Sequence, residues 1–173
     1  MKDLLGRQID HLRISLTNRC NLDCFYCHRE GNNKSIDTNL STKETDAQIE
    51  SVEMGVSRVI NILKSARQAG IKSIKFTGGE PLLREDIVQI IQSAVLLGFE
   101  DVGLTTNGTL LDRYAEALRQ AGLKRVNIGC DSLTGILPKN TGLLKENIRI
   151  AKQAEFDVKL NMVVLRALLF QMR

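Results

Sequence analysis

The sequence predicts an α/β fold in which parallel β-strands alternate with α-helices and curl into an open, partial barrel. Two observations predict it. Short runs rich in aliphatic and β-branched residues alternate with longer segments of helical periodicity. Within the short runs, apolar and polar residues alternate, which gives each strand one apolar and one polar face. If the apolar faces pack on the helices, the polar faces line a common interior.

The strands are predicted in chain order, about five in all, with boundaries good to about 2–4 residues. They cover residues 11–17, 72–77, 101–105, 125–130 and 158–165. The first helix should begin near Ser41, where Ser41 and Glu44 fit a capping box, and end at Gly70. Later helices are predicted over 84–97, 113–121 and 143–154, with Gly98 and Gly122 as C-terminal stops.

Five polar residues share the predicted interior face of these strands: Arg13, Lys75, Thr105, Asn127 and Lys159. Any one of the three cations could equally reach water at the end of its strand. Three cations at matching positions instead favour an anionic ligand, because charge in an interior is costly unless it is neutralised. Cys130 falls on the opposite, helix-facing side and is interpreted as a small buried hydrophobic residue.

Length, composition and charge narrow the classes of protein to which this chain can belong. The chain has 173 residues, 43% hydrophobic and 25% charged, which fits one packed domain. Its net charge of +4 is not gathered into Lys/Arg runs, so we expect no nucleic acid as a partner. No apolar stretch approaches the length of a membrane span and the start shows no secretory leader, so we expect a cytoplasmic protein without membrane attachment.

Three of the four cysteines, Cys20, Cys24 and Cys27, lie within eight residues in the loop after the first predicted strand. Such clustering indicates metal binding rather than disulfides. Thiolates are soft ligands for iron–sulfur clusters or zinc. A structural zinc site with His28 as fourth ligand is the alternative, although zinc ligands are usually separated by a spacer of two or more residues. A cubane cluster held by three thiolates leaves one iron open to another ligand.

Two turns follow the next predicted strands. Gly78, Gly79 and Glu80 follow the second, where paired glycines let the backbone approach a ligand and a carboxylate could bind an ammonium group. Taken alone, this stretch could equally be a tight turn into a helix that starts at Pro81. Asn107 and Gly108 follow the third strand, and on their own they indicate only a turn.

Five segments together resemble a known family. In order they read RCNLDCFYCHREG, IKFTGGEPLLR, LTTNGTLL, AGLKRVNIGCDSL and VKLNMVVL, within about residues 9–165. With them the chain resembles the radical S-adenosylmethionine (SAM) superfamily and, within it, the archaeal GTP 3′,8-cyclases of molybdenum cofactor biosynthesis. The resemblance implies a partial TIM-type barrel of the radical SAM kind, with residues 1–173 as one core domain.

The resemblance also implies roles for single residues. The three cysteines would bind a [4Fe-4S] cluster whose open iron binds SAM. Residues matching SAM contacts are Tyr26, Gly79, Glu80 and Gly129, and residues matching GTP contacts are Arg13, Lys75, Thr105 and Lys159. The family usually has serine where this chain has Gly129. We therefore expect one hydrogen bond to SAM to be missing, at a cost of about 0.5–1.5 kcal/mol.

The implied activity is that of a lyase. GTP and SAM would be converted to (8S)-3′,8-cyclo-7,8-dihydroguanosine 5′-triphosphate, 5′-deoxyadenosine and methionine. Expected partners are GTP, an electron donor and, as an option, a second copy in a homodimer. Family members continue into a C-terminal region with a second [4Fe-4S] cluster, which we expect to be absent here. Two alternatives stay open: a fragment that binds cluster and SAM without turning over GTP, and another radical SAM enzyme acting on a peptide or cofactor precursor.

Overall fold

The computed structural model of this chain describes residues 2, 4–22, 24, 27, 53–129 and 141–163, of which 141–143 by their backbone only. It contains one five-stranded sheet whose strands follow one another in chain order. The strands are β1 (His11–Ser15), β2 (Ser73–Thr77), β3 (Asp101–Thr106), β4 (Arg125–Gly129) and β5 (Asp157–Asn161). Every neighbouring pair is parallel. The predicted parallel α/β fold is confirmed, and the sheet is open, with β1 and β5 at its edges among the described strands.

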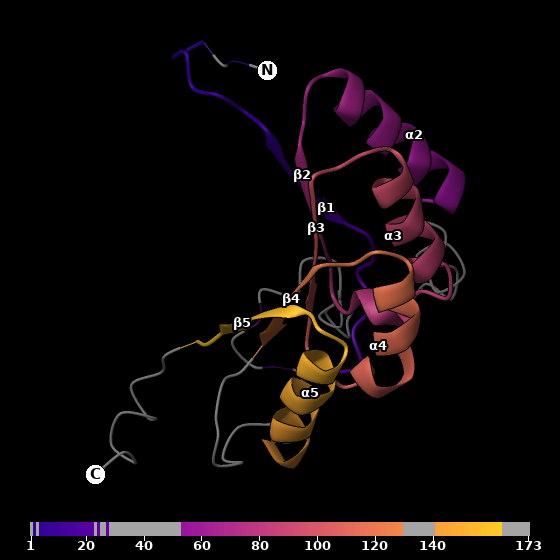
Figure 1. The fold of residues 1–173 in the computed structure, drawn as a ribbon, viewed down its shortest axis with the longest axis vertical. Helices are drawn as coiled ribbons and strands as arrows, with labels where there is room; N and C mark the ends of the chain where they lie inside the picture. Colours follow the sequence, from indigo (N-terminus) through magenta and orange to yellow (C-terminus); the bar gives the residue numbers. More distant parts are fainter. Residues whose placement is uncertain are drawn as a thin grey trace, which may run out of the picture.

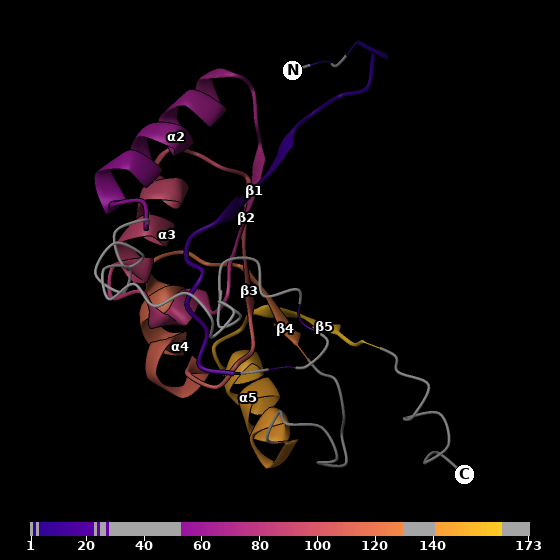
Figure 2. The ribbon, with the colours of Figure 1, turned by 180° about the vertical axis from the view of Figure 1, so that it is seen from behind.

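Helices connect the strands. They are α2 (Val56–Gln68), the short 3₁₀ helix η2 (Pro81–Leu83), α3 (Ile87–Leu96), α4 (Leu111–Gln120) and α5 (Thr141–Gln153). The four α-helices lie side by side on one face of the sheet (Figures 1 and 2). None of the described helices is long and apolar enough to cross a lipid bilayer.

Two glycines act as predicted at helix ends. Gly98 and Gly122 have φ angles of +80° and +89°, in the left-handed region that favours glycine. Each follows a helix that ends two residues earlier, α3 at Leu96 and α4 at Gln120. They let the chain turn back toward the next strand.

The hydrophobic core lies between the sheet and the helices. On the helix-covered face the strands bury the apolar residues Ile14, Ile74, Phe76, Val102, Leu104, Val126 and Ile128. Each of these has a polar residue or glycine as its chain neighbour on the opposite face, as the alternation in the sequence predicts. We call that opposite face of the sheet the polar face. In the described part of the chain it carries no α-helix (Figure 1).

The first helix differs from its prediction. Residues 53–55 are not helical, and Gly55 is the extended N-cap residue of α2 with ψ of 154°. A helix running from Ser41 through Gly70 is therefore wrong, although residues 41–52 themselves lie outside the described residues. Glycine favours the break, because it is the weakest helix former after proline. The non-helical segment before α2 also lets the carboxylate of Glu53 accept hydrogen bonds from Thr17 and Arg19.

The second predicted helix is also shorter than expected. Residues 84–97 do not form one helix, since Arg84 is extended with ψ of 125° and α3 begins only at Ile87. The side chain of Arg84 is buried and donates to the carbonyl oxygen of Leu16, just after β1, which explains the interruption. Strand β5 ends at Asn161 rather than near residue 165, and residues 164 and 165 lie outside the described residues. Cys130 also lies outside them.

Candidate functional site

Three loops meet at the carboxyl ends of β1, β2 and β3. They are the cysteine loop after β1, the turn of Gly78 to Glu80 after β2 and the turn at Asn107 after β3. Parallel strands place their carboxyl ends at one edge of the sheet, so these three loops are neighbours in space. Hydrogen bonds between the loops join all three into one connected group.

The paired glycines let the β2 turn pack against the backbone of the cysteine loop. A Cβ atom added to Gly78 would lie 2.4 Å from the carbonyl oxygen of Thr17, and one added to Gly79 would lie 2.2 Å from that of Arg19. The Gly79 and Glu80 amides donate to the same two carbonyl oxygens, each at 2.7 Å. Only glycine allows this approach, which fixes the chain immediately before Cys20.

The carboxylate of Glu80 is completely buried and joins the second turn to the third. It accepts hydrogen bonds from the Leu82 amide at 3.0 Å, from Thr106 Oγ1 at 2.7 Å and from the Asn107 amide at 2.7 Å. Three donors in a buried place hold the side chain in one position. In this structure Glu80 therefore orders the turns around it.

Asn107 links the third turn to the cysteine loop. Its Nδ2 donates to Asn21 Oδ1 at 2.8 Å and lies 3.9 Å from Cys20 Sγ. Burial raises the pKa of the Cys20 thiol, and the charge of Glu80 adds to the rise, while hydrogen bonds from the Leu22 backbone and Asn107 oppose it. The Cys20 thiol is consequently less acidic here than an ordinary cysteine side chain. From the sequence alone, Asn107 was interpreted only as a turn residue. Its position at the end of a parallel strand, next to the other two loops, could have indicated that it belongs to the site.

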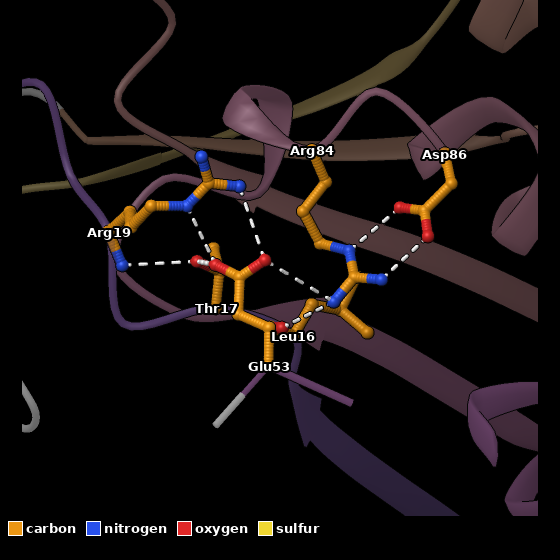
Figure 3. A network of polar contacts seen from close by, with 6 residues as sticks. All are labelled: Leu16, Thr17, Arg19, Glu53, Arg84 and Asp86. Atoms are coloured by element: carbon orange, nitrogen blue, oxygen red, sulfur yellow. Dashed lines mark hydrogen bonds and ion pairs between the residues drawn. The ribbon is translucent and has the colours of Figure 1, made fainter. Parts of the chain in front are cut away.

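Glu53, in the segment before α2, fastens the cysteine loop from the other side (Figure 3). It accepts from Arg19 Nε at 2.8 Å, from Arg19 Nη2 at 3.2 Å and from the hydroxyl of Thr17. Burial raises the pKa of the Glu53 carboxyl, but the hydrogen bonds from Arg19 and Thr17 outweigh it, and the pKa lies below its ordinary value. Glu53 is therefore ionised at neutral pH. No feature of the sequence pointed to this residue.

Arg84 completes this network from the loop after β2 (Figure 3). Its guanidinium donates to Asp86 at 2.8 and 2.7 Å and to the carbonyl oxygen of Leu16 at 2.9 Å, and it lies 3.9 Å from Glu53. Arg84 is only 4% exposed, and a buried charge is costly unless it is paired, so Asp86 and the Leu16 carbonyl oxygen stabilise it. The backbone of Leu16, immediately after β1, is thereby tied to the segment that follows η2.

The three cysteines differ in exposure. Cys24 is buried, Cys20 is half-buried and Cys27 is exposed, and the Cys27 amide donates to the Cys24 carbonyl oxygen at 3.0 Å. Within the described residues, no three His, Cys, Asp or Glu side chains lie close enough together to hold a single metal ion. A donor set of three cysteine thiols from one loop is the ligand chemistry of an iron–sulfur cluster. Tyr26 and His28 lie outside the described residues.

The predicted GTP residues all lie on the polar face. Arg13 and Lys75 are partners in register on β1 and β2, and Lys159 is the partner of Asn127 on β4. Thr105 is the partner of Asn127 on the other side. Burial lowers the pKa of the Lys75 ammonium, and the positive charges of Arg125, Arg13 and Lys159 lower it further. The structure thus places the predicted residues in two adjacent rows of one face, with Gly129 two residues beyond Asn127 on β4.

Arg125 is a fourth cation of the polar face that sequence analysis did not name. It forms an ion pair with Asp101 at 2.5 Å and stands two positions before Asn127 on β4. The signal was present, because residues two apart on a strand share a face. Its position at the start of the strand made it look like a boundary residue.

Comparison with known proteins gives a family match over most of the chain. A family model described as the radical SAM superfamily matches residues 14–169. Two curated relatives named probable GTP 3′,8-cyclase show similar identity. That of Methanocaldococcus jannaschii is 45% identical over 80% of this chain and 42% of its own length, and that of Methanococcus aeolicus is 43% identical over 95% and 54%. The chain thus spans about half the length of these relatives.

A solved structure has a similar fold. The crystal structure of Streptococcus suis SuiB bound to S-adenosylmethionine has a TM-score of 0.63 and 18% sequence identity, covering 88% of this chain and 32% of that one. At this identity the likeness concerns the fold alone. It agrees with an open sheet of parallel strands backed by helices.

Proposed function

The chain belongs to the radical SAM superfamily, and on that premise we propose that it acts as a GTP 3′,8-cyclase of molybdenum cofactor biosynthesis. It would convert GTP and SAM to (8S)-3′,8-cyclo-7,8-dihydroguanosine 5′-triphosphate, 5′-deoxyadenosine and methionine. The observation that carries the proposal is the group of cations, Arg13, Lys75 and Lys159, on the polar face of the sheet that carries the cysteine loop. Relatives with the same printed name, at 37–45% identity, support it.

We propose residues 1–173 as the radical SAM core domain, with Cys20, Cys24 and Cys27 holding a [4Fe-4S] cluster. Together with SAM, the cluster supplies one-electron reductive chemistry when bound, which requires an electron donor. The surrounding hydrogen bonds support the assignment, since the backbone before Cys20 is held by Gly79, Glu80 and Glu53. The backbone held in this way sets where the first of the three thiols begins.

SAM is proposed to lie between the cysteine loop and the strand ends, with contacts from Tyr26, Gly79, Glu80 and Gly129. The buried carboxylate of Glu80 accepts three hydrogen bonds from the protein. Its part in SAM binding is therefore to position the backbone of Gly79 and Asn107. Gly129 offers no side-chain hydrogen bond.

GTP is proposed to bind on the polar face through Arg13, Lys75, Thr105 and Lys159. Arg13 and Lys75 stand side by side on neighbouring strands, where they can neutralise a phosphate chain. The half-buried Lys75 has a lowered pKa because burial and three nearby cations disfavour its charge. A polyanion relieves that repulsion. Three cysteines close together in sequence also fit a reducing compartment, so we place the protein in the cytoplasm.

Anaerobic reconstitution with iron and sulfide tests the proposal. The protein should take up about four irons per chain, and with dithionite, SAM and GTP it should give 5′-deoxyadenosine and the cyclised nucleotide in equal amounts, measured by liquid chromatography and mass spectrometry. SAM cleavage without conversion of GTP would instead identify a cofactor-binding core or a radical SAM enzyme with another substrate. A loaded protein that leaves SAM intact contradicts both readings.

A further inference from the structure

Arg125 has no role in the assignments above, yet it lies in the middle of the polar face. In the register of the sheet, Arg13 pairs with Lys75, Lys75 with Gly103, and Gly103 with Arg125. These four residues form one row across four strands. The glycine therefore stands between two cations, on a face where every neighbour in the row carries a long side chain.

The guanidinium of Arg125 fills the space that Gly103 leaves open. A Cβ atom added to Gly103 would lie 3.2 Å from Arg125 Nη2 and 3.3 Å from Nε. The side chain thus lies across β3, on the side of Lys75, instead of extending into water. Asp101 holds it there through Nη2 at 2.5 Å, and Ser73 Oγ in turn donates to Asp101 Oδ2 at 3.0 Å.

Two buried polar atoms on this part of β4 have no hydrogen-bond partner among the described residues. They are Arg125 Nε and Asn127 Oδ1, and Asn127 is only 6% exposed. The second terminal nitrogen of Arg125, Nη1, also makes no hydrogen bond within the described part of the chain. An unpaired buried polar group costs free energy comparable to a lost hydrogen bond. A ligand that accepts hydrogen bonds on this face would satisfy the Arg125 guanidinium, whereas Asn127 Oδ1 requires a donor.

The balance of charge on the polar face points to the same kind of ligand. The described strands place four cations there, Arg13, Lys75, Arg125 and Lys159, and two carboxylates, Asp101 and Asp157. Positive charge is therefore in excess. Among the neighbouring charges, that of Arg125 lowers the pKa of Lys75 the most.

We propose that Arg125 is a phosphate-binding residue of this face, held by Asp101 across Gly103 so that its free Nη1 contacts the phosphate chain of the nucleotide beside Lys75. The inference rests on the proposed function in taking a nucleoside triphosphate as the substrate. Asp101 is the positioning residue, and Gly103 is the position that makes room. A guanidinium gives directional contacts to phosphate that an ammonium does not.

Titration of the full reconstituted chain with inorganic tripolyphosphate and with GTP, by isothermal titration calorimetry, tests the proposal. R125M should weaken binding of both by about tenfold or more, since a charge-assisted hydrogen bond is lost. R125K should recover part of the loss. G103A keeps every charge but forces the guanidinium to move, and we expect it to weaken binding as well.

Lys124 provides the matched control. It is exposed, one position before Arg125, and its Nζ contacts the Glu100 carbonyl oxygen at 3.4 Å. K124M removes the same charge from the neighbouring position and should change binding by less than about twofold. If R125M binds tripolyphosphate as tightly as K124M does, the proposal is overturned. If R125M does not fold, because Asp101 is left without its partner, the double variant R125M/D101N replaces it in the same comparison.

The two proposals fail separately. A wild-type chain that binds tripolyphosphate through Arg125 but forms no cyclised nucleotide refutes the proposed function and supports the assignment of Arg125. A wild-type chain that forms the cyclised nucleotide, while R125M binds GTP and tripolyphosphate unchanged, supports the proposed function and refutes the assignment. Absence of any tripolyphosphate or GTP binding to the wild-type chain refutes both.

Discussion

Glu53 accepts two hydrogen bonds from the guanidinium of Arg19, at 2.8 and 3.2 Å, although thirty-four positions separate the two residues. The contact joins the segment before α2 to the loop that carries the cysteines. Since Glu53 also accepts from Thr17, one carboxylate fixes two residues of that loop. The position of Cys20 therefore depends on a residue far from it in sequence.

Substitution of Glu53 should loosen the cysteine loop. E53Q keeps the shape of the side chain but removes its charge, and we expect the free energy of unfolding to fall by about 1 kcal/mol, because Arg19 is largely exposed and water screens the pair. The reconstituted variant should lose iron to a chelator faster than the wild type. The matched control is E100Q, which removes a surface ion pair with Lys72. Equal rates of iron loss in E53Q and E100Q would contradict the prediction.

Gly79 should tolerate no side chain. G79A would place Cβ 2.2 Å from the carbonyl oxygen of Arg19, a backbone atom that cannot give way alone. We expect a loss of about 2–4 kcal/mol in the free energy of unfolding, measured by urea denaturation, and poor uptake of iron. At Gly55 an added Cβ meets nothing within 4 Å, and G55A should cost less than about 1 kcal/mol. Similar losses in the two variants would show that the close approach is unimportant.

Three of the four cysteines should be cluster ligands, and Cys130 should not. C20A, C24A and C27A each remove one thiolate, and each should abolish the charge-transfer absorbance of the reconstituted cluster and the cleavage of SAM. C130A should retain both. The check is iron content together with the electron paramagnetic resonance spectrum of the reduced protein. A normal cluster in any of the first three variants would remove that cysteine from the ligand set.

Acid should weaken the network of Figure 3 through Asp86. The hydrogen bond from Arg84 holds the pKa of the Asp86 carboxyl below its ordinary value of 3.8, against the effect of burial. A carboxyl whose pKa falls on folding contributes stability that is present above the unfolded pKa and is lost as the pH falls through the folded value. Urea unfolding of the wild type and D86N should therefore give a constant difference above about pH 5 and a shrinking one below about pH 3.8. Parallel curves down to about pH 2.5 would count against this role of Asp86.

The alternation of residues in the strands predicted the fold and the polar face correctly because that signal is local. Lys75 and Phe76 are adjacent and must point to opposite faces of a strand. The same reasoning placed Arg13 and Lys159 on the polar face before the strand register was known. Arg125 was missed because it begins its strand, where the assignment of strand ends is weakest.

Contacts between distant segments were not predictable from the sequence. Glu53 lies in a stretch whose periodicity suggested the middle of a helix, whereas the structure has a bend there, with Glu53 paired to Arg19 and Thr17. The glycines after β2 were interpreted as room for a ligand, and the structure adds a second use, because they admit the carbonyl oxygens of Thr17 and Arg19. A local sequence pattern predicts which face of a strand or helix a residue occupies. It does not predict which distant residue packs against it, because that depends on the tertiary fold.

The four α-helices share one side of the sheet, and this arrangement has a consequence for how such a protein can diversify. Amino acids between sheet and helices must satisfy packing, so selection for folding governs them. Amino acids on the other side, such as Lys75, Thr105 and Arg125, are selected mainly for the ligand that they bind. A lineage could thus exchange one substrate for another by altering a handful of these positions, while the folded scaffold passes unchanged from ancestor to descendant.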